Sequence, residues 1–134
     1  MTLAEIKSQI MFQTNNDDED VVDFLPHLVD YINDGYDRLV KVWTKSHMAQ
    51  EEYPWLVEDT DEPNLPQWLH RYIADWATWL VYRNGNPQKQ NRGMAYRYAF
   101  EEVLAKLSDE GGSGGVDPET GANIRYNNFR NIPV

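Results

Sequence analysis

The sequence predicts an all-α fold: a small domain of four helices, with a kinked long second helix and an extended C-terminal arm. Apolar residues recur at steps of three and four along several stretches, which is the spacing of one helical face. A hydrophobic content of 41% and an aromatic content of 13% indicate a folded chain. A length of 134 residues allows one hydrophobic core but not two. We therefore expect a single helical domain over residues 1–110.

The first predicted helix is short and begins with a capping box. Thr2 and Glu5 have the spacing at which each side chain accepts a hydrogen bond from the other residue's backbone N–H. The helix is expected to end near Ile10 to Met11, before a polar loop. Its apolar face consists of Leu3, Ile6 and Ile10.

The second predicted helix begins with a run of acidic residues and contains a proline. Carboxylates are favourable in a first turn, where the backbone N–H groups lack partners and the helix dipole is positive. Pro26 removes a hydrogen bond and clashes with the preceding turn, so we expect it to kink the helix or split it in two. Gly35 is expected to weaken the helix slightly. The acidic run is Asp17, Asp18, Glu19 and Asp20.

A long connection over residues 46–64 follows, with two prolines and six acidic side chains. A loop of this length is often functional, but it could equally be a crossover that lets two helices pack. We leave both interpretations open. Four of its apolar residues are expected to fold back onto the core: Tyr53, Trp55, Leu56 and Val57.

The stretch from Leu65 to Gly85 is predicted to be the central packing helix. Pro66 suits the first helical position and Gly85 the position just past the last turn. Three of the five tryptophans lie here, and each can bury about 150–250 Å². The alternative is that some of these aromatic rings face a partner. The predicted apolar face carries Trp68, Leu69, Tyr72, Ile73, Trp76, Trp79, Leu80 and Arg83.

A fourth helix is predicted from Pro87 to about Asp109. The short link before it makes the third and fourth helices antiparallel neighbours. The apolar face is Tyr96, Phe100, Val103, Leu104 and Leu107. Basic residues near the link form either ordinary solubilising surface or an acceptor for an acidic neighbour. This basic edge consists of Arg83, Lys89, Arg92 and Arg97.

The chain changes character after Glu110. Residues 111–121 read as a glycine-rich linker and turn. Residues 122–134 mix aromatic, β-branched and basic side chains, which is not the composition of a purely disordered end. We interpret this segment as an arm that orders against a partner, with a loose terminus as the alternative. Its candidate partner-binding residues are Ile124, Arg125, Tyr126, Phe129, Arg130 and Ile132.

The distribution of charge is uneven. The net charge of −10 makes general affinity for nucleic-acid phosphates unfavourable. Residues 1–66 hold 15 acidic and 4 basic side chains, a net charge of −11, whereas residues 67–134 hold 7 acidic and 8 basic ones, a net charge of +1. This asymmetry reflects either two differing solvated surfaces or a head-to-tail oligomer. In an oligomer, the acidic run at 17–20 would meet the basic edge of the next copy.

Nothing in the sequence predicts catalysis, a metal site or a cofactor. There is no cysteine, and the three histidines, His27, His47 and His70, lack metal-binding spacing. The acidic run does not fit a calcium-binding EF-hand, because Val22 and Leu28 occupy its sixth and twelfth positions. No stretch resembles a membrane span or a secretory signal, so we expect a soluble protein that does not contact membranes.

The layout of the chain resembles the tailed-bacteriophage head–tail connector family, also called head completion or adaptor proteins. The resemblance rests on the opening LAEIKSQI, then DDEDVVDFLPHLVDYINDGYDRLVKVW, LPQWLHRYIADWATWLVYRNGN and the helix from Pro87 to Leu107. It covers most of residues 2–109, as an order and spacing of helices rather than a diagnostic motif. The glycine linker and asparagine-rich tail depart from the family pattern.

The resemblance implies a non-enzymatic, structural subunit. Such subunits form a ring, here by resemblance a dodecamer, that docks on the portal protein, extends the DNA channel and accepts tail or stopper proteins. DNA passes through without specific binding. The implied location is the head–tail junction of a virion, with synthesis in the bacterial host cytoplasm. The alternative is a small acidic helical regulator, a DNA mimic or inhibitor that sequesters a basic partner.

Overall fold

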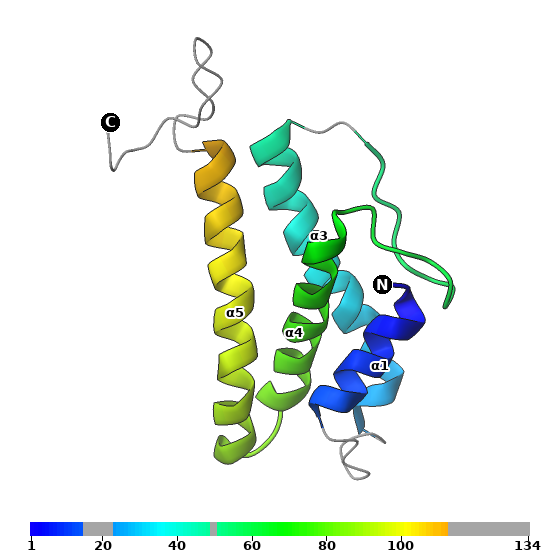
Figure 1. Cartoon of the computed structure of the whole chain (residues 1–134). Coiled ribbons are helices and arrows are strands. Elements are labelled where there is room, and N and C mark those ends of the chain that lie inside the picture. The colour runs from blue at the N-terminus through cyan, green and yellow to red at the C-terminus, as the bar shows by residue number, and fades with distance from the viewer. Residues whose placement is uncertain (15–22, 49–50, 113–134) are drawn as a thin grey trace.

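The structure, a computed structural model, describes residues 1–14, 23–48 and 51–112. Over these residues the chain forms four α-helices, a short 3₁₀ helix and no strand, which confirms the predicted all-α fold (Figure 1). No helix in this part of the chain is both long enough and apolar enough to cross a membrane. The elements are α1 (Leu3–Gln13), η1 (Leu25–His27), α3 (Leu28–His47), α4 (Gln67–Arg83) and α5 (Pro87–Gly112).

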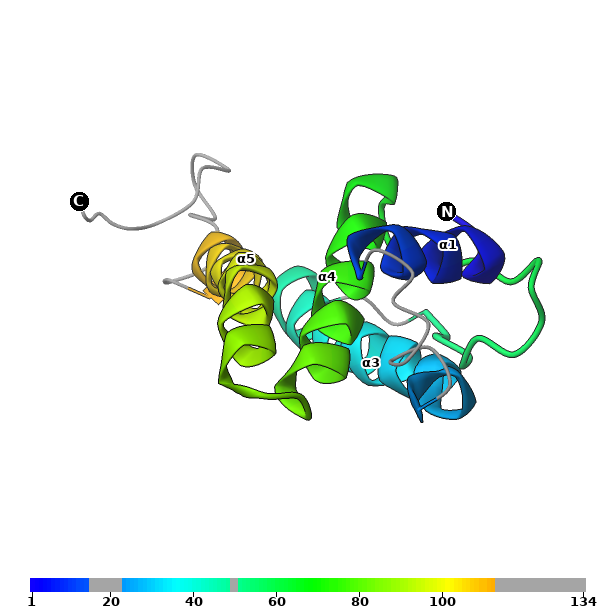
Figure 2. The ribbon, with the colours of Figure 1, turned by 90° about the horizontal axis from the view of Figure 1, so that it is seen from below.

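Helix α4 lies at the centre of the fold and contacts the other three helices. Helices α4 and α5 run antiparallel, as the short link between them predicts, and α3 packs against both. Helix α1 lies on the other side of α4 from α5, as the view from below shows (Figure 2). The core therefore forms around the tryptophan-bearing helix, as the sequence indicates.

The predicted start of α1 is confirmed. The backbone N–H of Glu5 donates to Thr2 Oγ1 at 3.2 Å, and the N–H of Thr2 donates to Glu5 Oε1 at 2.7 Å. All three predicted face residues are fully buried. The helix continues to Gln13, two residues beyond the expected end. Its last turn places Gln13 against α4, where this side chain joins a polar network described below.

Pro26 splits the second predicted helix, as expected. It lies in η1, and α3 begins immediately after it at Leu28. Phe24 and Leu28 are buried on either side of this break, so the core contact continues across it. The acidic run at 17–20, predicted to begin this helix, lies outside the described residues.

Helix α4 differs from the prediction at its first turn. Pro66 occupies the N-cap position and the helix begins at Gln67, whereas Gly85 does follow the C-cap residue. Trp76 is buried, with 8% of its surface exposed, and Trp79 is partly buried. Trp68 is 51% exposed, so its predicted place on the buried face is wrong. Eight residues of helix place it about 80° around the axis from Trp76, at the margin of the apolar face.

Two glycines allow α3 and α5 to approach α4 closely. A Cβ atom on Gly35 of α3 would lie 3.2 Å from Trp76 Cδ1, closer than ordinary van der Waals contact. A Cβ atom on Gly93 of α5 would lie 2.8 Å from both Trp79 Cε3 and Tyr82 Cβ. The sequence suggested only that Gly35 weakens its helix. The structure shows that both glycines make room for large rings on α4.

Helix α5 begins at Pro87, as predicted, and Asn86 caps it by accepting a hydrogen bond from the N–H of Lys89 at 2.9 Å. Its backbone remains helical to Gly112, three residues past the predicted end at Asp109, so the first two residues of the predicted linker belong to the helix. Phe100, Val103 and Leu107 are buried against the other helices.

Candidate functional site

The connection between α3 and α4 is ordered by a buried clamp. We call residues 51–62 the acidic loop. The side-chain amide of Asn33 on α3 donates to the Leu56 carbonyl at 2.9 Å, and the N–H of Leu56 donates back to Asn33 Oδ1 at 2.9 Å. Both residues are 2% exposed. Because buried backbone groups need partners, this pair fixes the middle of the loop on the core.

The acidic loop also caps helix α1. The N–H groups of Leu3 and Ala4 donate to the carbonyl oxygens of Asp61 and Asp59, at 2.8 and 3.1 Å. The ammonium group of Lys7 pairs with the Asp59 carboxylate at 2.9 Å. The loop therefore satisfies helix N–H groups that have no partner within the helix. The connection therefore has a structural role in holding α1, whichever of the two interpretations applies to its outward side.

The Asp61 carboxylate holds the loop's own shape. One of its oxygens accepts hydrogen bonds from the N–H groups of Val57 and Glu58, both at 2.8 Å. These two bonds stabilise the ionised form and lower the pKa of Asp61. The acidic loop is therefore held by hydrogen bonds within itself as well as by the bonds between Leu56 and Asn33 of α3.

The four apolar loop residues do not all fold back onto the core. Leu56 is buried and Tyr53 packs partly against the core, as predicted. Trp55 and Val57 are 63% and 69% exposed, so the prediction is wrong for these two. Neighbouring side chains of an extended segment point to opposite sides, and burying Leu56 turns both of its neighbours outward. A shallow depression of about 160 Å³ lies beside Trp55.

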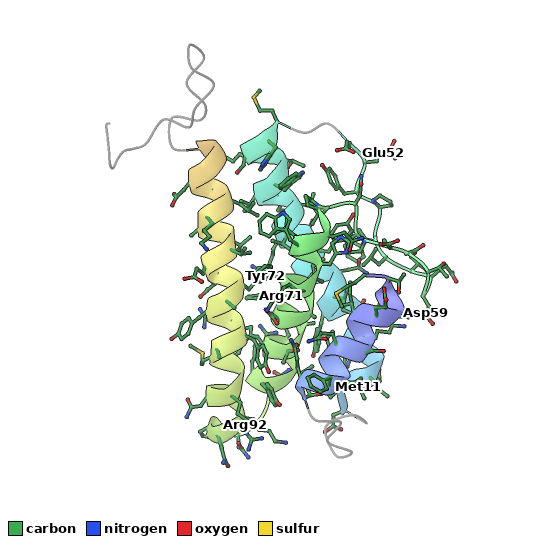
Figure 3. The ribbon with its side chains drawn as sticks, in the orientation of Figure 1. Met11, Glu52, Asp59, Arg71, Tyr72 and Arg92 are labelled. Atoms are coloured by element: carbon green, nitrogen blue, oxygen red, sulfur yellow. The ribbon has the colours of Figure 1, made fainter. Side chains whose placement is uncertain are left out.

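The predicted basic edge is only partly available for contact. Arg83 and Arg92 are exposed near the α4–α5 link, where Figure 3 shows Arg92 at the lower end of the molecule. Arg97 pairs with Glu101 at 3.3 Å and lies over the Trp79 ring, 5.4 Å from its centre. Its guanidinium group is therefore already engaged within α5 and with α4.

Lys89 of the basic edge lines a cavity of about 300 Å³ together with Asp23 and His27. Asp23, the first described residue after the acidic run, therefore lies at the same end of the molecule as the basic edge. The acidic run itself and the six candidate residues of the arm, Ile124, Arg125, Tyr126, Phe129, Arg130 and Ile132, lie outside the described residues.

A cluster of Asp34, Arg38 and Trp76 joins α3 to α4 at the surface. The indole N–H of Trp76 donates to Asp34 Oδ2 at 2.6 Å, and Arg38 pairs with the same oxygen at 2.9 Å while lying 4.7 Å from the Trp76 ring centre. Partial burial raises the pKa of Asp34, but the hydrogen bonds and the charges of Arg38 and Arg83 outweigh it and lower the pKa overall.

A buried polar network was missed by sequence reasoning. Asp75 on α4 is 6% exposed, and its Oδ1 accepts a hydrogen bond from Gln13 Nε2 at 2.9 Å. Thr78 and Tyr82 donate to the side-chain and backbone oxygens of Gln13. Burial raises the pKa of Asp75, although the Gln13 bond and the charge of Arg71 act in the opposite direction. The available signal was a lone carboxylate between apolar residues of a tryptophan-rich helix.

The histidines make separate contacts. His70 is buried and lies 2.8 Å from both the Met1 amine and the Leu65 carbonyl oxygen. His47 stacks on Trp43 at 3.7 Å, and His27 lies near Tyr31. Among the described residues, no group of three histidine, aspartate or glutamate side chains could hold a metal ion.

No protein-family model, curated protein or solved structure matches this chain. The geometry of the described residues offers two kinds of contact surface: the outward side of the acidic loop and the exposed basic residues near the α4–α5 link. These surfaces lie on different parts of the helical domain: Glu52 lies near its upper end, Asp59 at its side beside α1, and Arg92 at its lower end (Figure 3).

Proposed function

We propose that this chain is a structural, non-enzymatic subunit of a bacteriophage or prophage head–tail connector. In this role it forms a ring that docks on the portal, extends the DNA channel and accepts the tail. The observation that supports the proposal best is the order of helices. A short capped helix, a second helix broken at Pro26, a central tryptophan helix and a long final helix follow one another, in the order that the family resemblance implies.

The charge of the subunit suits a channel for DNA. A net charge of −10 repels phosphate groups, so DNA would slide past without being held. Trp76 and its neighbours form a rigid core, which leaves contact with other proteins to the surface and the chain ends. The proposed location is the head–tail junction of the virion.

A ring needs two different surfaces that meet between neighbouring copies. The exposed Arg83 and Arg92 provide a basic surface at one end, and the acidic loop provides an opposite charge elsewhere on the domain. The acidic run at 17–20 remains the other candidate for this contact and lies outside the described residues. We propose that the acidic loop supplies the carboxylates in the ring, and that the arm contacts the portal or a neighbouring subunit.

The alternative role as a DNA mimic has less support. A mimic presents carboxylates that are free to replace phosphates on a basic partner. Here Asp34, Asp37, Asp59 and Glu101 are each paired with a basic side chain of the same chain, at 2.9 to 3.3 Å. Other exposed carboxylates of the described part are spread over separate elements: Glu51, Glu52 and Glu58 lie on the acidic loop, Asp30 on α3 and Glu102 on α5.

Co-purification with a phage portal protein from the same genome tests the proposal. The full chain is expected to bind the portal, and deletion of residues 113–134 is expected to abolish binding while leaving helical circular dichroism and melting almost unchanged. Arg92→Glu is the variant for the ring contact, with the exposed Asn91→Glu as its matched control. A full chain that ignores the portal, or a deletion that binds it equally well, would count against the proposed role.

A further inference from the structure

Trp55 is exposed on a loop that hydrogen bonds hold against the core. Its neighbour Leu56 is clamped to Asn33 by two hydrogen bonds of 2.9 Å, and the Asp61 carboxylate holds the next two N–H groups at 2.8 Å. The indole nevertheless remains 63% exposed, and Val57 beside it is 69% exposed. A rigid support with outward apolar side chains favours binding, because little conformational freedom remains to be lost.

The surroundings of Trp55 define the chemistry of what can cover it. The adjacent depression of about 160 Å³ is lined by Pro54, Trp55, Leu56, Asp61 and Glu62. Asp61 already accepts two backbone hydrogen bonds and Glu62 pairs with the Met1 amine at 3.6 Å, so the lining itself offers mainly apolar contact. The acidic loop contains six acidic residues and no basic one. Glu51, Glu52 and Glu58 are exposed on the loop around this site. The surface therefore suits a segment that carries aromatic or aliphatic side chains together with arginines.

We propose that residues 122–134 of the same chain dock on the outward side of the acidic loop in the isolated subunit. This segment contains two basic residues and no acidic one. Its Tyr126 and Phe129 supply rings for the apolar depression, and Arg125 and Arg130 supply charges for the carboxylates. It is the one part of the chain beyond α5 with both properties, because the linker before it is rich in glycine and contains acidic residues.

The geometry of the helix ends allows this docking within one chain. Ser46, near the end of α3, donates to the carbonyl oxygen of Leu107 in α5 at 2.6 Å, so the two helices end side by side. The acidic loop begins three residues after Met48, and α5 ends at Gly112. The residues between Gly112 and Ala122 can span about 30 Å when extended. The arm therefore starts close to the end of α3, from which the chain continues into the acidic loop.

Photo-cross-linking on the full chain tests this docking. Trp55 is replaced by p-benzoylphenylalanine, and the cross-linked products of the isolated protein are mapped by mass spectrometry. Replacing an exposed side chain should leave the fold intact, which far-ultraviolet circular dichroism checks. We expect residue 55 to be joined to a peptide from residues 122–134, in a product with the mass of one chain. The same probe at Tyr98, which is 60% exposed on α5, is the control.

The charge contribution is measured with variants of the arm. Arg125→Gln combined with Arg130→Gln is expected to lower the cross-link yield roughly fivefold, as is salt at about 1 M. The matched control is Asn127→Gln combined with Asn128→Gln, which keeps both charges and is expected to keep the yield. Equal cross-linking from positions 55 and 98, or a cross-link found only between two chains, overturns the proposal. Because no portal is present, this result is independent of the connector role.

Discussion

Replacing Trp76 with alanine should destabilise the domain more than any other single truncation on α4. The ring is 8% exposed, packs against Phe100 with ring centres 4.8 Å apart, and fills the space that Gly35 leaves open. Large-to-small changes of a buried aromatic residue cost about 3–5 kcal/mol, because apolar contact is lost and a cavity remains. Small domains have a free energy of unfolding of about 5–15 kcal/mol, so Trp76→Ala removes a large fraction of it.

A second substitution separates packing from the hydrogen bond. Trp76→Phe keeps much of the ring but removes the indole N–H that donates to Asp34 at 2.6 Å. The Asp34 side chain is 43% exposed, so water and Arg38 replace part of the lost bond. We therefore expect Trp76→Phe to cost about 1–2 kcal/mol, less than the alanine variant.

The pH dependence of the phenylalanine variant checks the role of Asp34. The folded chain lowers the pKa of Asp34, so its contribution to stability is fully present above the carboxyl's ordinary pKa of about 3.9 and is lost as pH falls through the lower folded value. Trp76→Phe removes one of the bonds that lower this pKa. Its penalty should consequently be larger at neutral pH than at pH values below about 3.

Urea denaturation followed by far-ultraviolet circular dichroism measures these differences in the free energy of unfolding. The comparison requires that the slope of this free energy against urea concentration is the same for each variant. Trp68→Ala is the control, since this tryptophan is half exposed on the same helix and should cost about 1 kcal/mol or less. If Trp76→Ala costs no more than Trp68→Ala, then Trp76 is not the packing centre of the fold and the reasoning fails.

Three further predictions concern the clamp, the buried carboxylate and the close helix contact, each measured by urea denaturation. Asn33→Ala leaves both polar backbone groups of Leu56 without partners and should cost about 2–5 kcal/mol. Asp75→Asn should raise stability at neutral pH, because asparagine does not ionise. Burial raises the pKa of Asp75, so the free energy of unfolding of the unmodified chain falls as pH rises from the unfolded to the folded pKa of this carboxyl. Gly93→Ala should destabilise by about 1–2 kcal/mol, because its Cβ would lie 2.8 Å from side-chain atoms of α4.

Each of these predictions has a result that contradicts it. A cost below about 1 kcal/mol for Asn33→Ala would show that the loop is not held by the clamp. Destabilisation by Asp75→Asn at neutral pH would show that the ionised carboxylate stabilises the network around Gln13. A gain in stability for Gly93→Ala, comparable with that of an exposed Asn91→Ala control, would mean that α5 is not packed as closely as the structure places it.

The sequence predicts the helices well because their signals are local. The capping box at Thr2, the break at Pro26 and the start of α5 at Pro87 each depend on residues within one or two turns. The burial of Trp76 also follows from periodicity, which depends on one helix alone. These features could be read before any tertiary contact was known.

The contacts that position the candidate surfaces could not be predicted in this way. The Asn33 clamp joins residues 23 positions apart, and the bond between Gln13 and Asp75 joins residues 62 positions apart. Neither pair has a local sequence pattern. The residue type alone does not show whether an amide or carboxylate is solvated or bonded to a buried partner. The outward direction of Trp55 follows from the clamp on Leu56 and was mispredicted for the same reason.

The same limit applies to the charged surfaces. Net charge by halves of the sequence separates an acidic part from a basic part, but it cannot show that Asp23 and Lys89 line one cavity. Nor can it show that Arg97 is already paired with Glu101.

Native mass spectrometry of this protein mixed with a phage portal protein from the same genome tests the connector role most directly. We expect a complex in which many copies of this chain, twelve by resemblance to the family, are bound to one portal ring. Free subunits that are monomeric before mixing are compatible with this result, since ordering can accompany assembly. A protein that remains monomeric in the mixture and binds no portal would contradict the proposed function.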